Sequence, residues 1–91
     1  MSKDKTSLFD IKKLDTKQTK DTLKEVYDSL EERGYNPTNQ IVGYLISGDP
    51  GYISSYDDAR TKIKEIDRAK IVEILLDSFF DKYWHLVLAA K

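Results

Sequence analysis

The sequence lacks cysteine, and it has one histidine, His85, among 91 residues. Without thiols the chain forms no disulfide and offers neither a thiolate nucleophile nor a cysteine-based zinc site. A single histidine does not make a histidine-clustered metal site, and we expect His85 to be packed or surface-exposed. We therefore predict no metal, no cofactor and no catalytic residue, and a protein that is not an enzyme.

An excess of either charge is missing as well, and so is a long apolar run. Fifteen basic residues against sixteen acidic ones give a net charge of −1, which argues against a general nucleic-acid binder. The longest uncharged stretch, residues 34–48, contains Asn, Thr, Gln and Ser and is too polar to span a bilayer. The first residues form no apolar signal core. We expect a cytoplasmic protein without membrane insertion.

What is present fits one small helical domain. Apolar residues make up 40% of the chain and charged residues 34%, a globular composition. Residues 1–19 are rich in Lys, Asp and Thr, and their apolar residues keep no sustained period, so we predict a mobile N-terminal arm followed by a helical domain over residues 20–91. A chain this short buries roughly 60–65% of its unfolded surface, and self-association is an ordinary way to bury more.

Two helices are predicted in the first half of the domain. The first runs from about Lys20 to Arg33 and ends at Gly34; its core stripe is Leu23, Val26, Tyr27 and Leu30. Asn36 caps the second helix, with Pro37 at its first position. That helix is apolar on nearly all sides as far as Ser47, so we expect it to be central and buried, with another helix crossing close to Gly43.

Turn residues at 47–51 then end the second helix, and a short extended or 3₁₀ piece leads to two more helices. Capping boxes of Ser54 with Asp57, or Ser55 with Asp58, are expected to start the third. Asp67 is the predicted cap of the fourth, whose main stripe is Ile71, Ile74, Leu75 and Phe79, with a second stripe of Val72, Leu76 and Phe80. The fold class is all-α: a compact four-helix domain.

Two helices with so much apolar surface in so short a chain predict a homodimer, and the aromatic residues 83–88 seal that dimer or dock on another protein. Acidic residues at helix starts are expected to be caps rather than a catalytic pair, and residues 48–51 a turn rather than a phosphate loop. The residues predicted for the dimer or partner interface are Ile41, Tyr44, Leu45, Leu76, Phe80 and Trp84.

Residues 32–50, ERGYNPTNQIVGYLISGDP, closely resemble the IreB family of small bacterial regulatory proteins, and the resemblance continues to residues 71–73. It covers about residues 20–80. It implies an all-helical, non-catalytic homodimer. It also implies a substrate of a membrane-anchored Ser/Thr kinase with extracellular PASTA repeats, and of the cognate phosphatase, acting in cell-envelope stress and β-lactam tolerance on a downstream protein.

The family pattern places a phosphoacceptor threonine in the N-terminal arm, in an acid–x–Thr–x–x–Phe context. Residues 4–9, DKTSLF, match it, so the resemblance implies phosphorylation of Thr6. A second family threonine, three residues upstream, falls on Lys3, and Ser2 or Ser7 is left as a possible substitute. The family usually has a polar end where this chain has its aromatic tail.

Two other functions stay open at this point. One is an adaptor that docks constitutively on a partner protein through its C-terminal aromatic helix. The other is a small nucleic-acid-binding protein, suggested only by helix size and by Lys in the flanking segments.

Overall fold

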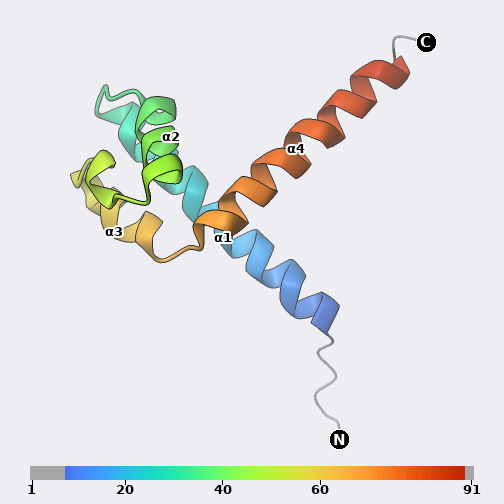
Figure 1. The fold of residues 1–91 in the computed structure, drawn as a ribbon, viewed down its shortest axis with the longest axis horizontal. Helices are drawn as coiled ribbons and strands as arrows, with labels where there is room; N and C mark the ends of the chain where they lie inside the picture. The colour runs from blue at the N-terminus through green and yellow to red at the C-terminus, as the bar shows by residue number, and fades with distance from the viewer. Residues whose placement is uncertain (1–7, 90–91) are drawn as a thin grey trace, which may run out of the picture.

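The computed structural model describes residues 8–89, and the side chains of residues 13–89. Over these residues the chain is all-helical, as predicted from the sequence (Figure 1). The elements are α1 (Leu8–Glu32), α2 (Pro37–Ser47), the 3₁₀ helices η1 (Pro50–Tyr52) and η2 (Tyr56–Asp58), α3 (Ala59–Lys64) and α4 (Arg68–Ala89).

Helix α1 begins at Leu8, well before the predicted start near Lys20. An ion pair one helical turn apart supports the added turns: Lys17 Nζ lies 2.8 Å from Asp21 Oδ2. Thr19 is buried, so this part of α1 packs against the rest of the chain. The described part of the predicted arm, residues 8–19, is therefore helical, whereas mobility of the arm stays a prediction.

The two ends of α2 follow the predicted local chemistry. The Asn36 side chain accepts a hydrogen bond from the Asn39 amide at 3.0 Å, and Pro37 occupies the first turn. Gly48 ends the helix with a left-handed φ of 78°, which a residue with a Cβ rarely adopts. The Arg68 guanidinium lies over this glycine and donates to the Leu45 carbonyl at 3.1 Å. The start of α4 is thus attached to the end of α2.

Helix α2 is not buried on all sides, which corrects the expectation from its apolar sequence. Ile41 and Tyr44 are buried, but Val42 is 45% exposed and Ile46 is 80% exposed. The close approach expected at Gly43 does occur, but the neighbour is the Tyr52 ring of η1 rather than another helix. A Cβ at residue 43 would collide with that ring.

The segment before α3 departs from the predicted capping boxes. Asp57 and Asp58 both have positive φ, 54° and 59°, and no side-chain hydrogen bond caps η2 or α3. Asp57 instead accepts a hydrogen bond from the Ser29 hydroxyl of α1 at 2.8 Å. This contact between distant parts of the chain holds the left-handed turn, and local pattern does not reveal it.

The core lies where α1, α2, α3 and the first turns of α4 meet. It is a small cluster of buried side chains: Val26, Leu30, Ile41, Tyr44, Ile53, Ala59, Ile63 and Ile71. Ile74 is also buried, and it is the last buried residue along α4 within the described chain. The Asp67 side chain accepts from the Ala69 amide at 3.1 Å and caps this helix as predicted.

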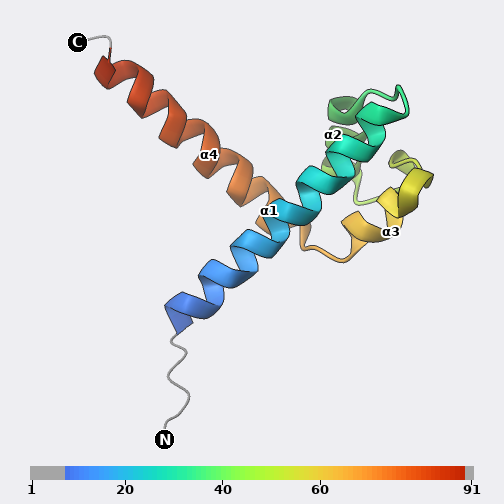
Figure 2. The same ribbon diagram turned by 180° about the vertical axis from the view of Figure 1, so that it is seen from behind.

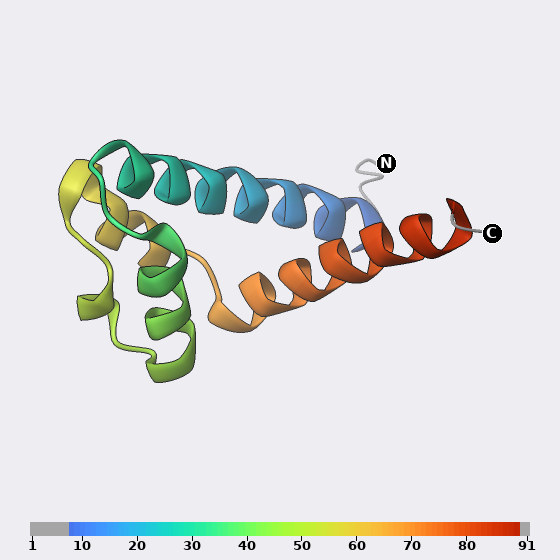
Figure 3. The same ribbon diagram turned by 90° about the horizontal axis from the view of Figure 1, so that it is seen from above.

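Beyond Ile74, α4 extends away from the other helices (Figures 1 and 2). Seen from above, α2 and α3 lie at one end of the molecule and the end of α4 at the other (Figure 3). The radius of gyration is 16.0 Å, against about 12 Å expected for a compact domain of this length. The predicted compact domain is therefore wrong for the described residues, because nothing within residues 8–89 packs on the outer half of α4.

Replacing the fully buried Ile63 with alanine is expected to lower the free energy of unfolding by about 2–5 kcal/mol, because it leaves a cavity in the core. Ile46→Ala is the matched control: this isoleucine is 80% exposed, and its replacement should change stability by about 0.5 kcal/mol or less. Urea unfolding followed by circular dichroism measures both, and equal small effects would contradict the assigned core.

Candidate interaction surface

The face of α4 that carries the core residues becomes polar after Ile74. Helical spacing continues the face of Ile71 and Ile74 through Ser78, Asp81 and His85. Beyond the core, the cleft between α1 and the outer half of α4 is lined mainly by polar residue types. Its lining is Thr16, Lys20, Ile74, Asp77, Ser78 and Asp81. On the side that continues the core, the outer half of α4 therefore presents polar side chains, which do not favour packing against α1.

The apolar side chains of this half point to a different side of the helix. We define the α4 apolar face as Val72, Leu75, Leu76, Phe79 and Phe80, which share one side at 100° per residue. All five are exposed, by 41% to 58%. The rings of Phe79 and Phe80 contact edge-on, with centroids 5.0 Å apart. The face is preorganised, since these rings already pack on one another.

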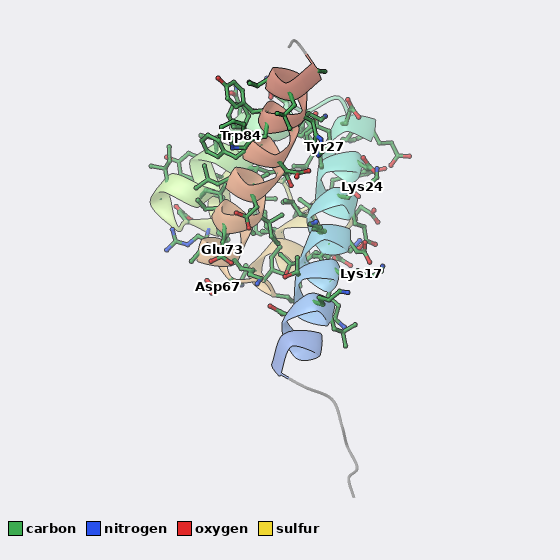
Figure 4. The ribbon with its side chains drawn as sticks, turned by 90° about the vertical axis from the view of Figure 1, so that its right-hand side faces the viewer. Lys17, Lys24, Tyr27, Asp67, Glu73 and Trp84 are labelled. Carbon is green, nitrogen blue, oxygen red and sulfur yellow. The ribbon has the colours of Figure 1, made fainter. Side chains whose placement is uncertain are left out.

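An apolar groove adjoins this face at its base. It has a volume of about 170 Å³ and lies between α1, α2 and α4. Leu75 belongs to both the groove and the face, so the two form one continuous surface. The groove lining is Leu23, Tyr27, Thr38, Ile41, Val42, Leu45 and Leu75. Figure 4 shows Tyr27 on α1 and Trp84 near the far end of α4.

The structure separates the predicted interface residues into two sets. Ile41 and Tyr44 are 7% and 6% exposed and belong to the chain's own core, which leaves little of either for another chain. Leu45 is half-buried and lines the groove. The exposed set is Leu76, Phe80 and Trp84, at 51–60%. Thr6, the predicted phosphorylation site, lies outside the described residues.

The sequence places Leu75 and Phe79 with Ile71 and Ile74 in the main stripe of α4, but Leu75 and Phe79 are 44% and 58% exposed. It also places Tyr27 in the core stripe of the first helix, but Tyr27 is 38% exposed and lines the groove together with Val42. A signal was present in the sequence: the positions that continue the core face of α4 are polar. That change in polarity marks where the intramolecular core ends.

Two acidic residues at the starts of helices have structural partners. Asp57 accepts from Ser29 and Asp67 caps α4, as described above. Arg60 donates from Nε to the Ile53 carbonyl at 2.8 Å. Among the described side chains, those of residues 13–89, no three of His, Asp or Glu are grouped as a metal site would require.

The few shifted pKa values arise from hydrogen-bond partners at the surface. Hydrogen bonds to Asp21 and Asp28 raise the pKa values of Lys17 and Lys24, respectively. A hydrogen bond with the Ser54 side chain lowers the pKa of Tyr35. His85 Nε2 lies 3.6 Å from Asp81 Oδ1, and its side chain is exposed. Surface exposure is one of the two placements predicted for this histidine. None of these groups lines the apolar groove.

Within residues 8–89, no helix is both long enough and apolar enough to cross a bilayer.

The surface thus consists of an apolar helix face and a groove that suit protein contact. A comparison with protein-family models matches residues 4–81 to the IreB regulatory phosphoprotein family. This range includes the central motif at residues 32–50 and all of the α4 apolar face, and it ends before the aromatic residues 83–84. It covers most of the 91 residues and confirms the resemblance noted in the sequence. The chain belongs to the IreB family of regulatory phosphoproteins.

Proposed function

We propose that this protein is a non-catalytic, cytoplasmic homodimer that is phosphorylated at Thr6 by a transmembrane Ser/Thr kinase with PASTA repeats and dephosphorylated by the cognate phosphatase. In this role it regulates a downstream protein in cell-envelope stress and antibiotic-tolerance signalling. Membership of a family of regulatory phosphoproteins supports the regulatory part. The exposed α4 apolar face is the observation that carries the homodimer.

A second copy is the proposed cover for the α4 apolar face and its groove. Single exposed apolar residues are normal in monomers, but a contiguous set of large ones marks an interaction site. Here five neighbouring side chains on one side of α4 join a groove lined almost entirely by carbon. An antiparallel or crossed pair of α4 helices covers both faces at once, because a two-fold interface uses the same patch on each copy.

Phosphorylation at Thr6 places new charge close to α1. Each phosphate carries about −1.5 to −2 charges at neutral pH. Thr6 is two residues before the first residue of α1, and this helix packs against α3 and α4 and carries exposed Lys13, Lys17 and Lys20. In this proposal the phosphate changes how the N-terminal segment contacts its own domain or a partner.

A second candidate function is a constitutive adaptor that binds a partner through the C-terminal aromatic helix without control by phosphorylation. The exposure of Trp84, at 60%, favours this alternative, as does its position beyond the family-matched residues. Replacing both Trp84 and Leu86 with serine distinguishes the two candidate functions. A double variant that is still a dimer but no longer captures the partner would support the adaptor.

Leu76→Asp combined with Phe80→Asp is expected to convert the dimer into a monomer, because it would bury two carboxylates in an apolar interface. Sedimentation equilibrium at micromolar concentration measures the mass. Leu14→Asp, on the equally exposed Leu14 of α1 (59%), is the control and should stay dimeric. A wild-type mass near 10.5 kDa at every concentration would contradict the homodimer.

Incubation with a PASTA-repeat kinase and ATP is expected to add phosphate to the peptide that contains Thr6, as read by peptide mass spectrometry. Thr6→Ala should remove this phosphate, whereas Ser7→Ala should keep it, because the matching motif is centred on Thr6. If the Thr6→Ala variant is still phosphorylated, the phosphoacceptor is another residue. An unmodified wild-type peptide would refute the proposed phosphorylation.

A further inference from the structure

The last turns of α4 differ from the rest of its exposed surface. We define the tip as residues 83–89, which form the outer end of the projecting helix (Figure 1). Its large side chains are among the most exposed in the molecule: Trp84 at 60%, Leu86 at 66% and Leu88 at 61%. At 100° per residue, the apolar residues of the tip occupy every side of the helix except that of His85.

Tyr83 continues the α4 apolar face, because its ring stacks on that of Phe79 with centroids 6.1 Å apart, but the rest of the tip has a different distribution. The face occupies one side of the helix, with Asp77 and Asp81 on the other, and a neighbouring helix can cover it. The tip is apolar around nearly its whole circumference, and one helix alongside leaves much of it in water. A helix segment that is apolar all round is typical of surroundings that are apolar on all sides, either a protein core or lipid. The described chain places no core around the tip.

The charge of the charged side chains along α4 changes sign at residue 82, next to the start of the tip. Residues 73–81 contain three acidic residues, Glu73, Asp77 and Asp81, and no basic one. Residues 82–91 contain Lys82, His85 and Lys91 and no acidic one. Tyr83 and Trp84 directly follow Lys82, and aromatic residues beside lysine are enriched at the boundary between water and lipid. The charge of this segment thus complements an anionic lipid surface.

The tip is also long enough to lie along that boundary. Seven helical residues extend about 10 Å, and helices that lie in the interface bury their apolar side chains about 5–10 Å into the headgroup and acyl boundary. The tip is far shorter than the roughly 20 residues needed to cross a bilayer. Because α4 projects from the other helices, the tip can reach a flat surface before they do (Figures 1 and 3).

We propose that the tip of α4 docks reversibly on an anionic lipid surface. Trp84, Leu86 and Leu88 enter the interface, and Lys82 stays at the level of the phosphate groups. The lipid contact itself does not depend on the proposed function. If Thr6 is the substrate of a transmembrane kinase, docking raises the concentration of that substrate near the enzyme, a consequence that rests on the proposed function.

Trp84 is the chain's sole tryptophan, so its fluorescence reports on the tip directly. Full-length protein at fixed concentration is titrated with phosphatidylcholine vesicles containing phosphatidylglycerol, and with phosphatidylcholine vesicles alone. We expect a blue shift and protection from iodide quenching with the anionic vesicles, and a smaller response at high salt. Co-sedimentation with the vesicles gives the bound fraction independently.

Leu86→Asp with Leu88→Asp is expected to weaken vesicle binding by at least about tenfold, because both leucines lose their burial and carboxylates face an anionic surface. Leu14→Asp, with similar exposure on α1, is the matched control and should bind like wild type. Circular dichroism checks that both variants are folded. Thr6 phosphorylation in detergent-solubilised kinase and the sedimentation mass should be unchanged in the tip variant, which separates this proposal from the proposed function.

Three outcomes would overturn the proposal. One is a blue shift that follows protein concentration and ignores vesicles, which would place a second copy on the tip. Another is an unshifted Trp84 spectrum with every vesicle. The last is equal binding to neutral and anionic vesicles, because the charge reversal at residue 82 would then have no role.

Discussion

The core of this chain ends at Ile74, while the helix that carries it continues to Ala89. On the side of α4 that continues the core, the residues are Ser78, Asp81 and His85, so folding back onto α1 would bury polar groups without apolar gain. The apolar residues lie on another side of the helix and face water. This mismatch between the two sides of α4 explains the elongated shape, and it creates the surfaces on which the proposed contacts depend.

The direction of α4 is set by its attachment to the other helices. Asp67 caps it, Arg68 donates to the Leu45 carbonyl at the end of α2, and Ile71 is fully buried in the core. These contacts fix the start of α4 relative to α1 and α2. The groove and the α4 apolar face therefore keep a defined relation, and a second copy would meet a surface that is already formed.

Local signals in the sequence predicted the parts of the fold that local chemistry determines. The cap at Asn36, the helix end at Gly34 and the cap at Asp67 are confirmed, because each depends on residues within one turn. The early start of α1 was missed, since its support includes contacts with distant residues, such as Lys70 Nζ at 3.8 Å from Asp15.

The candidate surface was predicted only in part, for a related reason. Apolar periodicity identifies residues that avoid water, but it does not say whether their cover comes from the same chain. Leu75 and Phe79 were therefore predicted in one stripe with Ile71 and Ile74, although the structure buries the two isoleucines and exposes Leu75 and Phe79. Conversely, Ile41 and Tyr44 were predicted at an interface and are buried within the chain. Only the packing of the helices shows which of the apolar residues are buried within the chain.

If a second copy covers the α4 apolar face, isotope-filtered NMR on mixed labelled and unlabelled protein detects the contact between the two copies. We expect intermolecular nuclear Overhauser effects between the methyl groups of Leu75 or Leu76 in one copy and the rings of Phe79 or Phe80 in the other. Their absence in a sample that tumbles as a 10.5 kDa monomer would contradict the proposed homodimer.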